Sequence, residues 1–470
     1  MIGWHSLVRT VVVTGAICAA SYAAAQEGPP SLAGRWDGTI DVPGATLSFS
    51  VTFGTPSGEL TGTIDVKAHK ASPLAAIKVT GHNIHFELQA AKPAIAVFDG
   101  TIQRDSMLGT FTQGRARGTF SLRRVDASTV AAPAPPYRSE DVTFANGSVT
   151  LAGTVTIPQG TGPFRALVMV TGSGAQNRDE ELFGFKIFAT IADHLTRHGV
   201  AVLRYDDRGI GGSTGNTRGS TTADFAGDAL AGLALLAGRP EIDRTRIGIW
   251  GHSEGATVAA IAAARSSDVA FIVMMAPPAI PGEVLLARQQ ADAARALGAS
   301  PDEVAAEQAA FKKVVDAIRS NAPADVLETA VRNQIAAQYD ARSIGARAEL
   351  AERSAFVDKV LPGAMSQLRS RGIRDLIDSD PTLALAMVRC PVLAVFGGKD
   401  AQVRPDLNRP ALEAAFAKGG HIQPTVTLYS HANHLFMAAT SGQPSEYASL
   451  PKVFVPGFLD DATRWLLAVR

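Results

Sequence analysis

A serine lies between two glycines where a predicted strand turns into a predicted helix. Residues 246–250 are short and apolar, which predicts a buried strand, and the small residues after Gly255 predict a closely packed helix. Gly251 and Gly255 each stand two residues from Ser253, which leaves room where strand and helix nearly touch. With this context, the stretch predicts an exposed nucleophilic serine rather than a plain glycine-rich turn.

A nucleophilic serine needs a base to take its proton and a third group to orient that base. Asp400 follows the predicted strand 391–397 on a Gly-Gly turn, and His434 lies in the loop after the predicted strand 425–428. Because catalytic groups in parallel sheets gather at the carboxyl ends of strands, these residues are expected to meet. The chain order of Ser253, Asp400 and His434 therefore predicts a catalytic triad.

Other residues compete for two of these roles. His431 and His421 are alternatives for the base, but His434 is preferred because the apolar pair Leu435-Phe436 can lead its loop back to the fold. Asp406 is the alternative for the acid, but Asp400 is preferred because it lies on the Gly-Gly turn, three residues past its strand.

A tetrahedral intermediate needs two backbone N–H donors. The amide of Glu254 is expected to be one, and the loop after the strand 165–170 the source of the other, with Ser173 the first choice and Gly174 the second. The Gly-Ser-Gly turn could instead bind a dinucleotide, but Asn177 stands where the third glycine would be. This chemistry needs no metal and no organic cofactor, and we expect neither.

The elements that would hold these residues alternate between strands and helices from residue 139 onward. Asn146-Gly147 predicts a hairpin at the start of this region. Strands are then predicted at 165–170, 200–205, 246–250 and 270–275, with helices at 182–198, 222–237 and after Ser253. Such alternation predicts a mostly parallel sheet that is covered on both faces.

More than a hundred helical residues interrupt this alternation before the strand that leads to Asp400. Ser300-Pro301-Asp302-Glu303 combines an N-cap serine, a proline at the first position and a glutamate at the third, which predicts a helix start. We expect residues 278–388 to form an inserted cap that shapes the pocket and excludes water. A helical bundle with no part in the site is the alternative.

Residues 26–125 differ from the rest of the chain. Leu47, Phe49 and Val51 alternate with polar residues, and similar period-two segments follow between Gly and Asn turns. About eight short antiparallel strands are expected, enough for a small all-β barrel or sandwich whose ligand, if any, is not specified. Residues 126–138, rich in Pro and Ala, predict a stiff linker to a second domain at 139–470.

Residues 1–25 predict a signal peptide, because a short apolar run follows Arg9 and three alanines precede Gln26. An exported chain, periplasmic or secreted, is therefore expected, with an uncleaved membrane anchor as the alternative. A lipid anchor on Cys18 is disfavoured because a bulky residue precedes it. Cleavage would leave Cys390 as the lone cysteine, so no intramolecular disulfide could form.

The composition of the 470 residues is that of a soluble globular protein, with 46% hydrophobic and 19% charged residues. The length predicts two or three domains. Because the formal net charge is zero, nothing indicates nucleic acid or an anionic membrane surface as a partner. After signal cleavage we expect no stable membrane insertion, and the composition leaves the oligomeric state open.

These motifs resemble the α/β-hydrolase superfamily, and within it bacterial cap-bearing serine carboxylesterases with an N-terminal β domain. The resemblance spans about residues 140–470, and residues 31–125 are similar to a β domain sometimes fused ahead of such enzymes. Four motifs carry the resemblance: Gly-His-Ser-Glu-Gly at 251–255, Gly-Ser-Gly at 172–174, Asp-Arg-Gly-x-Gly-x-Ser at 207–213, and Asn433-His434. In the third motif we expect Asp207 and Arg208 to lock the loop by charge pairing. Ala256 departs from the family, which often has glycine there, but alanine still suits a close-packed helix.

The resemblance implies hydrolysis of a small-molecule carboxylic ester through an acyl-enzyme intermediate. It does not specify the acyl or alcohol group, because this fold hosts many acyl-transfer reactions. A serine peptidase, amidase or thioesterase would use the same triad and stays an alternative. A binding protein whose β domain does the work, beside a vestigial hydrolase domain, is an alternative of another class.

Overall fold

The computed structural model describes residues 32–125 except 43–44, 55–59, 67–71, 90–94, 104 and 115, and residues 135–469 except 344–346 and 348–349. The expected signal peptide and most of the expected linker lie outside the described residues. The chain divides into two compact units, with residues 25–135 in one and 136–470 in the other. Within the described part of the chain, no helix has the length and apolar character needed to cross a bilayer.

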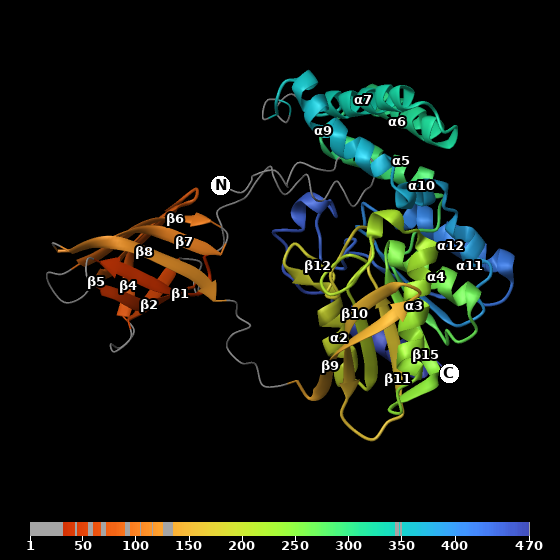
Figure 1. The fold of residues 1–470 in the computed structure, drawn as a ribbon, viewed down its shortest axis with the longest axis horizontal. Coiled ribbons are helices and arrows are strands. Elements are labelled where there is room, and N and C mark those ends of the chain that lie inside the picture. The colour runs from red at the N-terminus through yellow and green to blue at the C-terminus, as the bar shows by residue number, and fades with distance from the viewer. Residues whose placement is uncertain are drawn as a thin grey trace. The chain divides into compact units, whose positions relative to one another are not determined.

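The N-terminal unit is a closed antiparallel barrel of eight strands in which each strand pairs with its neighbour in sequence (Figure 1). β1 and β8 pair antiparallel and close the sheet, so the structure selects the barrel over the sandwich. Buried aromatic side chains such as Phe86 and Phe98, whose ring centroids lie 4.7 Å apart, pack in the interior. The strands are β1 (Gly34–Val42), β2 (Ala45–Gly54), β3 (Thr61–Val66), β4 (Ser72–Thr80), β5 (Asn83–Gln89), β6 (Ile95–Gln103), β7 (Ser106–Gln113) and β8 (Ala116–Val125).

The second unit is built on an eight-stranded sheet in the order β18-β17-β16-β15-β11-β14-β10-β9. β9 pairs antiparallel with β10, and β10 pairs antiparallel with β14. From β14 to β18 all neighbouring strands are parallel. The strands are β9 (Tyr137–Asn146), β10 (Val149–Pro158), β11 (Phe164–Val170), β14 (Val200–Tyr205), β15 (Ile242–His252), β16 (Ile272–Met275), β17 (Val392–Gly397) and β18 (Thr425–Tyr429). Parallel pairing places the ends of β11, β15, β16, β17 and β18 at one edge.

Helices cover both faces of this sheet, and each face has its own apolar core (Figure 1). One core receives α3 (Thr222–Ala237), α4 (Glu254–Arg265) and α12 (Pro405–Gly419). The opposite core receives α2 (Ile187–Arg197) and α13 (Phe458–Ala468).

The expected helix at 182–198 was predicted too long at its start. A small hairpin, β12 (Glu181–Leu182) with β13 (Phe185–Lys186), occupies that segment, and α2 begins at Ile187. Phe183 and Gly184 both have positive φ, which is a turn conformation that an α-helix cannot include. The correction matters because this hairpin reaches the site.

The helices inserted between β16 and β17 form a bundle around a separate apolar core. Its second helix, α6, begins at the predicted capping box, in which Ser300 and Glu303 bond reciprocally. One carboxylate oxygen of Asp375 accepts hydrogen bonds from the amide and hydroxyl of Thr222, which ties the bundle to the start of α3. The helices are α5 (Gly282–Ala296), α6 (Pro301–Arg319), α7 (Ala324–Asp340), α9 (Arg353–Leu368), α10 (Arg371–Asp378) and α11 (Pro381–Leu385).

Candidate active site

Ser253 occupies a strained turn between β15 and α4. Its φ of 54° and ψ of −120° are unusual for a residue with a side chain, and its amide donates to the Met275 carbonyl oxygen at 2.8 Å. A Cβ on Gly251 would lie 1.9 Å from the Gly255 carbonyl oxygen, and a Cβ on Gly255 would lie 2.2 Å from that of Val170. Both glycines are therefore required by close backbone approach, as their spacing predicts.

His434 and Asp400 lie together, although 34 residues separate them. His434 Nδ1 is 2.8 Å from Asp400 Oδ2, and both side chains are buried. The other carboxylate oxygen accepts the backbone amides of Gln402 and Val403, each at 2.8 Å. Since a carboxylate can only accept, Nδ1 carries the proton and Nε2 is left as the basic nitrogen.

The residues that the sequence offered as alternatives for the base and the acid lie outside the cavity. His431 and His421 are exposed. Asp406 is paired with Arg404 at 2.6 Å on the surface. None of these three residues lines the cavity that Ser253 and His434 share.

Asn433, the residue before His434, holds the shape of the loop that carries the imidazole. Its buried Oδ1 accepts the amides of Leu435 and Met437 at 2.9 and 3.0 Å, which folds the loop back on itself. Leu435 and Phe436 are fully buried in the core under α13, as their apolar character suggests. The loop that carries His434 is therefore anchored on both sides of the imidazole.

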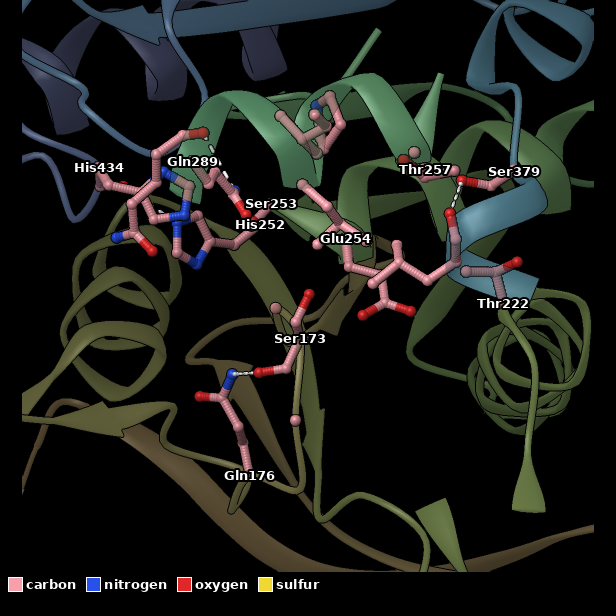
Figure 2. Close-up of a pocket in the computed structure, with 18 of the residues that line it drawn as sticks. Ser173, Gln176, Thr222, His252, Ser253, Glu254, Thr257, Gln289, Ser379 and His434 are labelled. Atoms are coloured by element: carbon pink, nitrogen blue, oxygen red, sulfur yellow. Dashed lines mark hydrogen bonds between the residues drawn. The ribbon is translucent and has the colours of Figure 1, made fainter. Parts of the chain in front are cut away.

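The loop after β11 brings Ser173 and Gly174 to the same cavity as Glu254 (Figure 2). Its backbone is braced from inside, because Asp207 accepts the Thr171 hydroxyl on one oxygen and the Gln176 amide on the other, each at 2.8 Å. Gln176 also donates through its side chain to the Ser173 carbonyl oxygen at 3.2 Å. Burial raises the pKa of Asp207 to about 7.

The expected charge pairing of the 207–213 loop holds for one of its two residues. Arg208 pairs with the buried Asp228 at 2.6 Å. Asp207 does not act as predicted, since its side chain accepts from a hydroxyl and an amide of the loop after β11. Its position behind that loop could not be read from the motif.

Sequence reasoning also missed Glu180, a fully buried carboxylate that belongs to none of the motifs. Its Oε1 accepts the Gly172 amide and contacts His252 Nδ1, both at 2.8 Å. The other ring nitrogen of His252 lies 3.0 Å from the His434 carbonyl oxygen. The only local signal was an acidic residue soon after the Gly-Ser-Gly turn.

A cavity of about 240 Å³ opens over Ser253. Its walls come from the β12–β13 hairpin, from α5 and α10 of the inserted bundle, and from the loops that carry His434 and Tyr447. The apolar lining residues are Leu182, Phe183, Pro278, Ile280, Leu285, Leu286, Leu376, Pro381 and Leu435. Within the described chain, this lining contains one carboxyl group, that of Glu254, and neither lysine nor arginine.

The Glu254 carboxyl faces the Ser173 hydroxyl (Figure 2), and burial raises its pKa. The cavity is therefore mainly apolar, and Glu254 is the one acidic side chain in its described lining. Across the described residues, no group of three His, Cys, Asp or Glu side chains is arranged to hold a metal ion.

Comparison with known proteins finds curated relatives and solved structures that are similar to this chain. Esterase EstD of Thermotoga maritima is 28% identical over 332 residues, which cover 70% of this chain and 68% of the relative. Polyketide transferase claH of Penicillium crustosum is 37% identical over 91 residues, 18% of this chain and 29% of the relative. Among solved structures, DcsB in complex with its substrate analogue has a TM-score of 0.43 at 17% identity, covering 71% of this chain and 100% of that one.

The family model described as serine aminopeptidase, S33, matches residues 185–439, which is more than half of the chain. The matched stretch runs from the β12–β13 hairpin past His434 and includes the inserted bundle. The predicted α/β-hydrolase resemblance is thereby confirmed, and the chain belongs to the serine aminopeptidase S33 family of hydrolases.

Proposed function

We propose that this protein hydrolyses carboxylic esters, with Ser253 as nucleophile, His434 as base and Asp400 as the group that orients the base. The observation that carries the proposal is the 2.8 Å contact between His434 Nδ1 and Asp400 Oδ2 beside the cavity that the strained Ser253 lines. The name of the Thermotoga maritima relative, an esterase, supports the choice of bond.

The reaction would follow from these positions. His434 Nε2 takes the proton of Ser253 as the hydroxyl oxygen attacks the ester carbonyl, and the amides of Glu254 and Ser173 stabilise the oxyanion. His434 then returns the proton to the departing alcohol. Water resolves the acyl-enzyme by the same route, while Asp400 stabilises the imidazolium in both halves.

The lining of the cavity favours a neutral ester over an aminopeptide. A peptide with a free amino terminus carries an ammonium group, which needs ionised carboxylates around it when it is desolvated. Glu254 is the one carboxyl group in the described lining, and burial favours its neutral form. The family description keeps aminopeptide cleavage as the competing activity to be measured.

A fluorophosphonate probe and paired chromogenic substrates test the proposal. The purified protein should be labelled on Ser253 and should turn over p-nitrophenyl esters faster than amino-acyl p-nitroanilides. Ser253→Ala and His434→Ala should abolish turnover, while His431→Ala, at an exposed alternative histidine, should retain it. Faster anilide turnover would reassign the enzyme as a peptidase, and an unlabelled, inactive folded protein would refute the hydrolase mechanism.

We also propose that the chain is exported to the periplasm or beyond. The support is the sequence pattern of residues 1–25, with its short apolar run and small residues before Gln26. Mass spectrometry of the protein from its native host should find an N-terminus at Gln26. Retention of residues 1–25 would instead indicate a membrane anchor.

A further inference from the structure

Glu180 and His252 form a buried pair that reaches three parts of the site. Glu180 is 0% and His252 is 2% exposed. The carboxylate bonds to the amide of Gly172, the residue before Ser173, and to the imidazole next to the nucleophile. The imidazole in turn bonds to the backbone of His434. The pair therefore connects the oxyanion loop, the nucleophile turn and the base.

The hydrogen bonds determine how many protons the pair holds. The His434 carbonyl oxygen can only accept, so His252 Nε2 must carry a proton. The contact between His252 Nδ1 and Glu180 Oε1 needs a second proton, since neither a carboxylate nor an unprotonated ring nitrogen can donate. The pair thus holds two protons. Both are placed on the imidazole, because Glu180 Oε1 also accepts the Gly172 amide and a carboxylate oxygen can accept both bonds at once. Burial opposes the resulting charge on His252, but the charge and hydrogen bond of Glu180 outweigh it and raise the pKa of His252.

The surroundings leave the pair little freedom. A Cβ on Gly172 would lie 3.3 Å from the Cβ of Ser253, 3.4 Å from Glu180 Oε1 and 3.5 Å from His252 Nδ1, so these four residues are tightly packed. Glu180 also has a positive φ of 46°, a conformation that a glutamate keeps only when its surroundings hold it there. Strained, buried and charged groups of this kind concentrate at functional sites.

We propose that Glu180 is a positioning residue for the reaction at Ser253, acting through His252 to hold the oxyanion loop and the backbone of His434 in place around the nucleophile. This inference rests on the proposed serine hydrolase function. It does not require Glu180 to touch the substrate, and Glu180 does not line the cavity.

The substitution Glu180→Gln tests this positioning role without removing the side chain. The variant keeps size and one acceptor oxygen but removes the charge that holds the second proton on His252. A neutral His252 keeps its proton on Nε2 for the His434 carbonyl oxygen, so Nδ1 then needs a donor. The new amide can supply one only by turning its nitrogen toward His252, which withdraws the oxygen from the Gly172 amide. The expected result is a fall in kcat of about 10- to 100-fold with KM changed less than about threefold, because positioning is lost while the apolar cavity stays.

Glu307→Gln is the matched control, because Glu307 is an equally buried glutamate that lies in α6 of the inserted bundle and does not line the cavity. It should leave kcat per titrated active site within about twofold. Wild-type kcat in folded, fluorophosphonate-titrated Glu180→Gln would overturn the proposal.

Nitrogen NMR of histidine-labelled wild-type protein reads the protonation of the imidazole directly. His252 should have both ring nitrogens protonated at neutral pH, and its signals are identified as those absent from His252→Asn. A singly protonated His252 ring would overturn the proposal. If wild-type protein is neither labelled nor active on esters, the proposed function fails, and the NMR result still decides for or against the charged pair.

Discussion

Asp400→Asn should reduce kcat by about 10⁴-fold, equivalent to about 5 kcal/mol of transition-state stabilisation. The structure determines which way the new amide must face. Asp400 Oδ1 accepts two backbone amides, from Gln402 and Val403, so the oxygen of an asparagine must take that place. The opposite orientation would leave two buried N–H groups facing another donor, at a cost of about 1 to 3 kcal/mol each.

The amide nitrogen of the variant is therefore directed at His434 Nδ1, where Asp400 Oδ2 now lies at 2.8 Å. Nδ1 must then be the acceptor, and the ring proton moves to Nε2. That tautomer cannot accept the proton of Ser253, which is the reason for the predicted loss.

Turnover of a p-nitrophenyl ester, normalised to folded protein, measures this effect. KM should change little, because the substituted group does not line the cavity. Asp406→Asn is the control, since that exposed carboxylate was the alternative acid and pairs with Arg404 on the surface. Retention of more than about a tenth of wild-type kcat by Asp400→Asn would refute this account of the base.

Three further substitutions have defined outcomes. Gly251→Ala should lower the free energy of unfolding in urea by more than about 3 kcal/mol, because its Cβ would lie 1.9 Å from a backbone oxygen; Gly219→Ala, with nothing within 4 Å, should be near neutral. Asp207→Asn should remove a pH dependence of stability. Burial raises the pKa of Asp207 to about 7, so the folded chain keeps a proton that the unfolded chain loses at lower pH. Wild type should therefore lose stability relative to the variant as pH rises from about 4 to about 7. Parallel stability–pH curves for the two proteins would contradict this. Leu376→Trp should reduce turnover of p-nitrophenyl hexanoate at least about tenfold more than that of the acetate, because each methylene excluded from the cavity is worth about 0.8 kcal/mol; Leu383→Trp, at a side chain that is 65% exposed, should affect both esters equally.

Much of the fold could be predicted because its signals are local. The predicted strand 200–205 and helix 222–237 coincide with β14 and α3, since a buried parallel strand is a short apolar run and a helix start has its own capping residues. The choice between barrel and sandwich was different. It depends on whether β1 pairs with β8, and those strands lie at opposite ends of the unit's sequence.

The sequence by itself determined the candidate nucleophile, because serine, strand, helix and both glycines lie within a few residues of one another. It also limited the acid and the base to a few candidates near strand ends. Only the tertiary structure brought His434 to Asp400 and placed Asp207 behind the loop after β11. It also joined Glu180 to His252 across 72 residues and His252 to the His434 backbone across 182. These contacts are hydrogen bonds between buried polar groups, whose partners are determined by three-dimensional packing and leave no periodic or local pattern along the chain.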